Sequence, residues 1–200
     1  MIKIKLINEA IEQSSYDKIK PNMRTFMPRP GSTGENLGDE EIKSRLHGKR
    51  NPPSAFTEKV PSKIENVPRA FKRDILQRTD MKPKGLWYGF GTEWVDWVRA
   101  EMPSWESDSI YELVIDDSKV LKLTDDSMID EFTNIYGVRD NRFPDLVPKI
   151  RWQDVAEKYT GIEINPYSWE ARANHSWYYG WDIASGCIWG ANVLKGSRKL

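Results

Sequence analysis

The pattern of apolar and polar positions predicts a mixture of strands and helices from about residue 55 onward. Strands are expected where apolar and polar residues alternate, or where turn residues bound a short apolar run. The predicted strands are residues 85–88, 111–115, 119–123, 161–164 and 184–189, the last being the final strand, and another could start at 56–58. Apolar residues at helical spacing predict helices at residues 68–78, 92–101, 126–136 and about 152–159. This mixture predicts the α+β class.

The first 54 residues have a different pattern. Leu6, Ile7, Ala10 and Ile11 recur at helical spacing, which predicts a short amphipathic helix over residues 2–13. Residues 20–54 are rich in proline and glycine and poor in large apolar groups, so they bury too little surface to offset the entropy of ordering. We therefore divide the chain into residues 1–54, an N-terminal helix and extended arm, and residues 55–200, a tryptophan-rich α+β domain.

The tryptophans support this division. All nine lie between Trp87 and Trp189, and the first 86 residues contain none. Large aromatic side chains dominate the energetics of cores and interfaces. The folded mass is therefore expected to run from about residue 55 to about residue 190.

Charge is divided between the two ends of the chain. Residues 1–80 contain 16 Lys and Arg against 11 Asp and Glu, whereas residues 81–200 contain 14 against 19. A basic arm favours acidic partners, including nucleic acid, because its cations neutralise phosphates. An excess of this size is also common without such a partner, and the acidic balance of residues 81–200 disfavours nucleic acid.

Several kinds of site and location are excluded or disfavoured. Cys187 is the only cysteine, so an intramolecular disulfide and a cysteine metal cluster are impossible, which fits a reducing compartment. His47 and His175 are too far apart in the sequence to form a recognisable zinc motif. The N-terminus lacks the apolar core of a signal peptide, and no stretch approaches the roughly 18 apolar residues of a membrane span. We expect no metal site and no membrane association.

Residues 82–92 form the first candidate site. They combine a strand, a turn containing Gly89 and Gly91, and a helix that begins at Thr92. Backbone N–H groups at a helix N-terminus suit a phosphate, and glycine permits close backbone approach. The segment matches no known phosphate-loop motif, so a plain tight turn is the alternative.

Residues 161–169 form the second candidate site. Glu163 points away from Ile162 and Ile164, on a strand that ends at an aromatic-rich turn containing Tyr167. A carboxylate in a cleft there would polarise a hydroxyl group or stabilise a developing positive charge. The alternative is a glutamate on a solvated sheet face.

Residues 177–189 form the third candidate site, with five aromatic residues in thirteen positions, beginning at Trp177. Their faces could enclose a nicotinamide, an adenine or an unpaired base. The alternative is a packed corner of the core in which small residues let elements approach closely. Cys187, in an apolar strand, is interpreted as a buried, inert thiol.

The order of four segments resembles a known family. These are residues 83–88 (PKGLWY) followed by a tryptophan-bearing helix, residues 111–115 with 120–123, residues 159–164 (YTGIEI), and the strand at 185–189. The series is similar to phage and bacterial proteins of the ADP-ribosyltransferase-like class. The resemblance covers roughly residues 55–190.

The resemblance implies a split-sheet fold that binds NAD in a cleft between two small sheets and transfers ADP-ribose to a protein or nucleic acid. It implies an Arg or His on an early strand, a role left to Ser54 or Thr57 here, and a supporting residue on the second strand, either Tyr88 or Thr92. A late-strand Glu is matched by Glu163, with Asp182 and Glu170 as rivals. The NAD-binding residues so implied are Thr57, Tyr88, Gly89, Thr92, Tyr167, Trp177 and Asp182.

Two other functions remain open. The chain could be a non-enzymatic phage structural, assembly or interaction protein that grips a protein partner with residues 1–54, its tryptophans serving as core and interface anchors. It could also bind nucleic acid by stacking bases on the aromatic residues at 177–181. The expected location is the cytoplasm, that of the host if the protein is phage-encoded, or the virion. The oligomeric state is left open.

Overall fold

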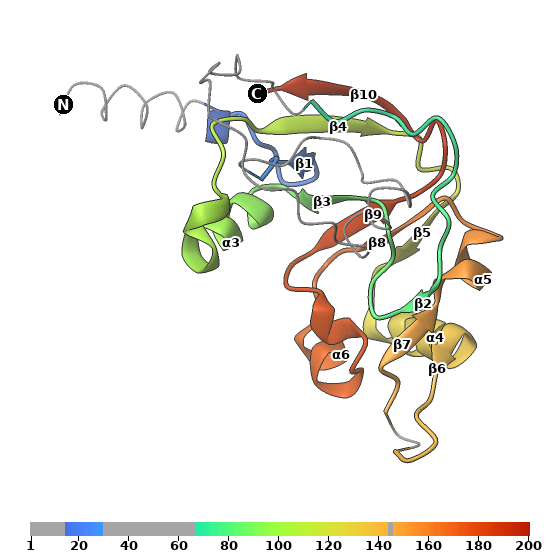
Figure 1. Ribbon diagram of the computed structural model, residues 1–200. Coiled ribbons are helices and arrows are strands. Elements are labelled where there is room, and N and C mark those ends of the chain that lie inside the picture. The colour runs from blue at the N-terminus through green and yellow to red at the C-terminus, as the bar shows by residue number, and fades with distance from the viewer. Residues whose placement is uncertain (1–14, 30–66, 144–145) are drawn as a thin grey trace, which may run out of the picture.

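A computed structural model describes residues 15–29, 67–143 and 146–200 (Figure 1). The described part contains both helices and strands, which confirms the α+β class. Its strands are β1 (Arg24–Phe26), β2 (Thr79–Asp80), β3 (Leu86–Phe90), β4 (Tyr111–Ile115), β5 (Val120–Leu123), β6 (Gly137–Val138), β7 (Lys149–Arg151), β8 (Gly161–Ile164), β9 (Ser185–Ile188) and β10 (Leu194–Lys199). Its helices are α3 (Glu93–Glu101), α4 (Asp126–Tyr136), α5 (Trp152–Ala156) and α6 (Trp169–Asn174), with 3-10 turns η1 (Pro103–Trp105) and η2 (Tyr178–Gly180).

The strands form two sheets. Seven strands lie in the order β10-β4-β1-β3-β9-β8-β5, and three lie in the order β2-β7-β6. Within the larger sheet only β5 and β8 are parallel, and the other neighbouring pairs are antiparallel. Hydrogen bonding is continuous from β3 through β9 to β8, so the strands that bear Tyr88 and Glu163 are separated by a single strand.

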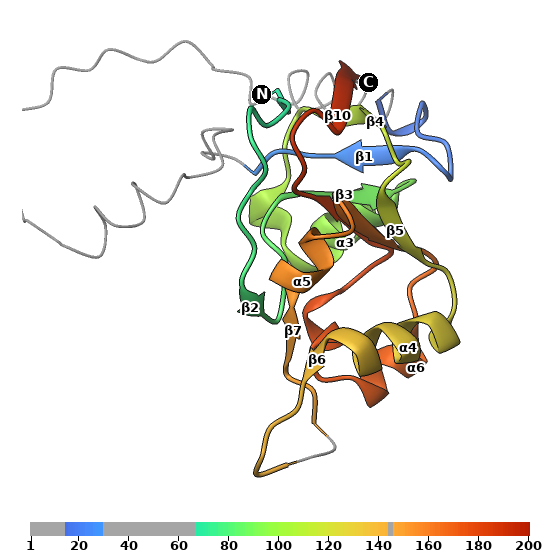
Figure 2. The ribbon, with the colours of Figure 1, turned by 90° about the vertical axis from the view of Figure 1, so that its right-hand side faces the viewer.

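The two faces of the larger sheet are packed differently. On one face, Trp152, Trp177, Trp181 and Trp189 form a buried core with Ile164 and with residues of helices α4, α5 and α6. Figure 2 shows where these three helices lie relative to the strands. On the other face lies a second core, which includes Leu86, Tyr88, Phe90, Tyr111, Leu113, Ile115 and Ile188. A third, smaller core joins Met27 to Val95 and Val98 of α3. Because successive strand residues point to opposite faces, neighbouring residues of β3 and of β9 enter different cores.

Most elements predicted from periodicity are confirmed. Strands β3, β4, β5, β8 and β9 and helices α3 and α4 lie within a few residues of their predicted bounds, and α5 is shorter than predicted. The start of α4 has a clear local cause. The Asp125 side chain accepts a hydrogen bond from the Met128 backbone N–H, as expected for an N-cap residue.

The helix predicted at residues 68–78 is wrong. No helix is present there, and the backbone forms bonds with distant segments instead. The Ile75 N–H donates to the Trp189 carbonyl at 2.9 Å, and the Phe71 carbonyl accepts from the Asn192 N–H at 3.4 Å. Tertiary partners thus satisfy polar groups that a helix would have satisfied internally.

The prediction that β9 is the last strand is also wrong. β10 follows it and pairs antiparallel with β4 along the sheet edge, with a register shift between Leu194 and Gly196. Its sequence, LKGSRK, is polar and contains a glycine, so it lacks the alternation that would identify a strand.

Strand β1 corrects the prediction of an arm over residues 20–54. Residues 24–26 pair antiparallel with both β3 and β4, so β1 is an interior strand (Figure 1). Thr25 is fully buried, and its hydroxyl donates to the Gly91 carbonyl at 2.8 Å. The helix predicted at residues 2–13, the arm from residue 30 to 54 and the strand expected at 56–58 lie outside the described residues.

Candidate functional site

Glu163 lies in the interior of the larger sheet. It pairs with Lys122 of β5 on one side and with Gly186 of β9 on the other, and its side chain is on the face opposite Ile162 and Ile164. That direction agrees with the alternation predicted from the sequence. The face is not solvated, however, because Glu163 is only 5% exposed. A buried carboxylate requires hydrogen-bond or ionic partners.

Tyr88 and Arg24 are those partners. The Tyr88 hydroxyl donates to Glu163 Oε1 at 2.8 Å, and Arg24 Nε donates to the same oxygen at 2.6 Å. Arg24 Nη2 lies 3.3 Å from Glu163 Oε2, so the guanidinium engages both carboxylate oxygens. This two-point geometry is the strongest form of arginine–carboxylate pairing.

Gly186 makes the contact between Tyr88 and Glu163 possible. It lies between them on β9, and a Cβ atom at this position would be 2.4 Å from Tyr88 Cζ. The tyrosine ring therefore crosses β9 over the glycine to reach the carboxylate two strands away. This is a close approach that only glycine permits.

The network extends to the protein surface. Arg24 Nη2 donates to Asp117 Oδ2 at 2.8 Å, and Lys122 Nζ donates to the same oxygen at 2.7 Å. We call Arg24, Tyr88, Asp117, Lys122 and Glu163 the ion cluster. Two cations balance two carboxylates within it, and Glu163 is the buried member of the four charged groups.

The protonation states of the ion cluster follow from its contacts. Burial, reinforced by the Glu163 charge, raises the pKa of Tyr88 well above its ordinary value, so its hydroxyl remains a donor. Burial alone would lower the pKa of the Arg24 guanidinium, but its bonds to Glu163 and Asp117 raise it overall. Hydrogen bonds from Lys122 and Arg24 lower the pKa of Asp117 to about 2.

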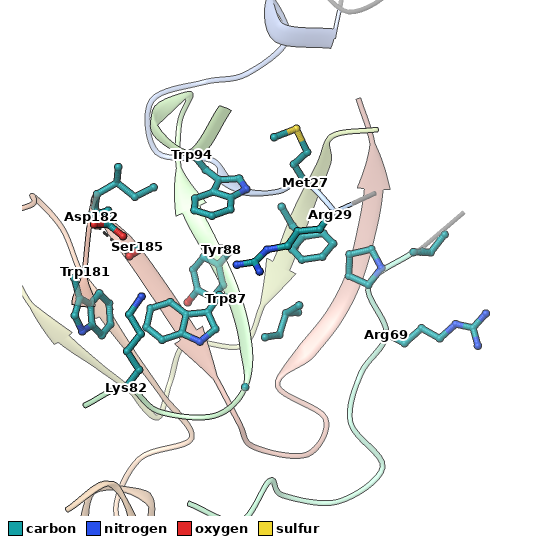
Figure 3. Close-up of a pocket in the computed structure, with 16 residues that line it drawn as sticks. Met27, Arg29, Arg69, Lys82, Trp87, Tyr88, Trp94, Trp181, Asp182 and Ser185 are labelled. Carbon is teal, nitrogen blue, oxygen red and sulfur yellow. Dashed lines mark hydrogen bonds between the residues drawn. The ribbon is translucent and has the colours of Figure 1, made fainter. Parts of the chain in front are cut away.

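A cavity of about 470 Å³ adjoins the ion cluster, and Tyr88 belongs to both (Figure 3). Its lining includes the end of β1, the residues just after that strand, and the first part of β3. Trp87, Trp94 and Trp181 give it aromatic walls, and Arg29, Arg69, Lys82 and Asp182 contribute charges. Its size and mostly apolar lining with a few polar groups are typical of small-molecule sites.

The structure places two of the predicted NAD-binding residues, Tyr88 and Asp182, at this cavity. Gly89 and Thr92 are close in sequence but do not line it. A Cβ atom at Gly89 would be 2.7 Å from that of Trp94, so the glycine allows α3 to approach the sheet. Thr92 occupies the N-cap position of α3, but its side chain forms no capping bond.

Tyr167 and Trp177 lie elsewhere. The Tyr167 hydroxyl donates to the Trp181 carbonyl at 2.8 Å, and its ring faces a second cavity that Glu170 also lines. Trp177 is fully buried and donates to Thr133 Oγ1 at 2.9 Å. Trp177 is therefore part of a packed corner of the core, which was the alternative to a ligand-binding role. Trp181 lines the first cavity.

The remaining candidate residues lie at different places in the structure. Glu170, a rival to Glu163, is exposed on α6 beside the second cavity. Asp182, the other rival, lies at the first cavity and 3.4 Å from Arg172 Nη1. Thr57 lies outside the described residues. Of the proposed acidic residues, Glu163 alone contacts Tyr88.

No role was predicted for Arg24, Arg29 or Lys82, although Lys82 is the first residue of the candidate segment 82–92. The two arginines fall in the segment interpreted as an arm, and Lys82 precedes the strand predicted at residues 85–88. A weak signal was present for Arg24, because Met23, Phe26 and Met27 form an apolar group that interrupts the polar arm. Met23 and Met27 are both buried, so they hold this part of the chain against the domain.

Among the described residues, no group of three or more His, Cys, Asp and Glu side chains is arranged to hold a metal ion. The helices of the same ranges are all too short or too polar to cross a membrane. Comparison of the chain with protein-family models, with curated proteins and with solved structures finds no match. Inference about function therefore depends on the site itself.

Proposed function

We propose that this protein binds NAD and transfers its ADP-ribose group to an acceptor. The observation that supports this most strongly is the convergence of Arg24, Tyr88 and Glu163 from strands β1, β3 and β8, with contacts of 2.6 and 2.8 Å. The resemblance to ADP-ribosyltransferase-like proteins implies an Arg or His on an early strand, a supporting residue on a second strand and a late-strand Glu. Arg24, in place of the expected Ser54 or Thr57, is proposed for the first role, with Tyr88 and Glu163 for the other two.

The adjoining cavity supports the same proposal. Trp87 and Trp181 meet edge to face with ring centroids 4.7 Å apart, so they present a rigid aromatic surface beside Tyr88. A planar ring such as nicotinamide fits such a surface, and aromatic walls exclude water from it. Exclusion of water favours transfer to an acceptor over hydrolysis.

NAD, when bound, supplies the ADP-ribose group, with nicotinamide as the leaving group and positive charge developing at the ribose. Glu163 is the residue proposed to stabilise that charge, since a fixed carboxylate in a water-poor site does so efficiently. Arg24 holds the carboxylate in place. In the present arrangement Tyr88 occupies one Glu163 oxygen, so a substrate hydroxyl would take the place of the Tyr88 hydroxyl.

The test is an NAD titration followed by tryptophan fluorescence, with nicotinamide release measured by chromatography. Wild type is compared with Glu163→Gln, which keeps the size of the side chain, and with Glu157→Gln, an exposed control on another segment. We expect saturable quenching in all three proteins and nicotinamide release that Glu163→Gln alone loses. Absence of binding at millimolar NAD would rule out the proposal, and binding without release would reduce it to a non-catalytic NAD site.

A second candidate function is that of a non-enzymatic interaction or assembly protein. Trp169 and Tyr179 are 74% and 63% exposed, and the Arg172 guanidinium lies 6.0 and 4.3 Å from their ring centroids. Tryptophan, tyrosine and arginine are the residues most enriched in interface hot spots. Sedimentation velocity over a range of concentrations, on wild type and Trp169→Ser, tests self-assembly through this surface. A wild-type monomer at every concentration would contradict it.

A further inference from the structure

Three cationic residues line the aromatic cavity, namely Arg29, Arg69 and Lys82, and two of them lie near its tryptophans. Lys82 precedes β3 and Arg29 follows β1, and both line the cavity near Trp87 (Figure 3). The Lys82 ammonium lies 5.0 Å from the centroid of the Trp87 ring, and the Arg29 guanidinium lies 3.5 Å from that of Trp105. Both charges are therefore positioned against aromatic rings, where a cation is favoured over an uncharged polar group.

Lys82 is partly desolvated in this cavity. Burial lowers the pKa of Lys82, the Asp182 charge opposes that change in part, and the Arg29 charge adds to it by a smaller amount. Burial also lowers the pKa of Arg29. An anion bound beside Lys82 and Arg29 would be attracted by both cations and would restore part of the solvation that Lys82 loses on burial.

The shape of the cavity specifies the ligand further. Trp87, Trp94 and Trp181 supply flat aromatic faces, and Asp182 lies on the wall opposite the arginine in Figure 3. An anionic group is repelled by Asp182 and attracted to Lys82 and Arg29. Aromatic faces favour a planar ring through stacking, which is worth about 1–3 kcal/mol per base in proteins that bind nucleotides this way.

We propose that Lys82 and Arg29 form the phosphate subsite of the cavity, and that the ligand is a planar organic phosphate whose ring packs against Trp87. Lys82 is the principal phosphate-binding residue because its ammonium is a compact point charge with three donors. The Lys82 stem is held by packing, since its Cε would be 2.8 Å from a Cβ atom placed at Gly180. The ammonium thus reaches the cavity from a fixed base.

This inference deepens the proposed function and rests on it only for the choice of NAD as the natural ligand. The subsite consists of Lys82, Arg29 and Trp87, none of which belongs to the ion cluster. It requires no bond cleavage and no role for Glu163. Its failure is therefore distinguishable from failure of the proposed transfer reaction.

The experiment compares AMP with adenosine as probes, by isothermal titration on the full chain. The two share a planar ring and a ribose and differ in the phosphate. The variants are Lys82→Met, which keeps the aliphatic stem, Lys82→Arg, which keeps the charge, and Lys195→Met, a half-exposed lysine on β10 outside the cavity. Thermal unfolding of each variant establishes that it is folded.

We expect AMP to bind at least about tenfold more tightly than adenosine, which corresponds to 1.4 kcal/mol. Lys82→Met should remove that preference, whereas Lys82→Arg and Lys195→Met should retain it. Equal binding of AMP and adenosine, or an unchanged preference in folded Lys82→Met, would overturn the proposal. If the subsite behaves as expected and NAD releases no nicotinamide, the transferase proposal fails and the subsite stands. If nicotinamide is released but the preference for AMP is the same in Lys82→Met as in wild type, the subsite proposal fails and the transferase proposal stands.

Discussion

The Tyr88 hydroxyl lies 2.8 Å from the Glu163 carboxylate, and the two side chains meet across Gly186, which has no side chain to separate them. Three adjacent strands thus supply a donor, a gap and an acceptor on one sheet face. The contact is set by strand pairing, since Gly186 pairs with Tyr88 and with Glu163. The geometry of the candidate site therefore depends on the register of the central strands.

Gly186→Ala should destabilise the protein by about 1–3 kcal/mol, the usual cost of forcing extra volume into a packed interior. The added methyl would meet the Tyr88 ring at 2.4 Å, and the backbone there is in a conformation open to alanine, so the effect is steric. Urea unfolding measures the change. Gly196→Ala is the control, because a Cβ atom at Gly196 meets nothing within 4 Å, and it should change stability little. Equal effects of the two substitutions would contradict the close approach described for Gly186.

Tyr88→Phe should cost about 1–3 kcal/mol, because it removes one donor from a buried carboxylate that stays buried. The matched control is Tyr111→Phe. The Tyr111 hydroxyl is also buried but has no hydrogen-bond partner among the described residues, so its removal should be neutral or stabilising. Chemical denaturation of both variants gives the comparison. A Tyr88→Phe protein as stable as Tyr111→Phe would show that the Tyr88–Glu163 bond contributes nothing.

Arg24→Met should destabilise the protein by about 3–5 kcal/mol, because it leaves the Glu163 carboxylate buried without its cation. Combining it with Glu163→Gln should restore part of the loss, since the charge that needed pairing is then absent. A double-mutant cycle measured by urea unfolding quantifies this coupling. Arg142→Met is the control, because Arg142 pairs with Asp140 at the surface and is 81% exposed; it should cost less than about 1 kcal/mol. Strict additivity of the Arg24 and Glu163 substitutions would contradict the pairing.

These residues also indicate how far the sequence could predict the site. A short apolar run predicted β3, and alternation predicted β8 and the direction of Glu163, because both patterns are local. The resemblance placed Tyr88 and Glu163 in one site, whereas their separation by the single strand β9 depends on long-range pairing that periodicity does not encode. Residues 24–26 are too short and too close to prolines and glycines to be recognised as a strand, although β1 is interior.

The same limit applies to the helix predicted at residues 68–78 and to Trp177. In the first case, tertiary hydrogen bonds from Ile75 to Trp189 and from Asn192 to Phe71 override a helical pattern. In the second, both Trp177 and Trp181 are buried in the same core, but only Trp181 also lines the cavity. Composition identifies the aromatic segment, but it does not predict which of the rings line the cavity.

The pH dependence of stability should report on Asp117. Its folded pKa of about 2 lies below the ordinary 3.8, because Lys122 and Arg24 donate hydrogen bonds to the ionised form. A depressed carboxyl pKa gives stability that is present above the unfolded pKa and lost as pH falls toward the folded pKa. The wild type should therefore exceed Asp117→Asn in unfolding free energy by a constant amount above about pH 5, where the unfolded chain is ionised as well. That difference should decrease as the pH falls from about 4 toward 2. Urea unfolding of both proteins through this range measures it, at one fixed ionic strength because exposed charges are screened by salt. A difference that stays constant down to pH 2 would mean that Asp117 does not pair with these cations in solution.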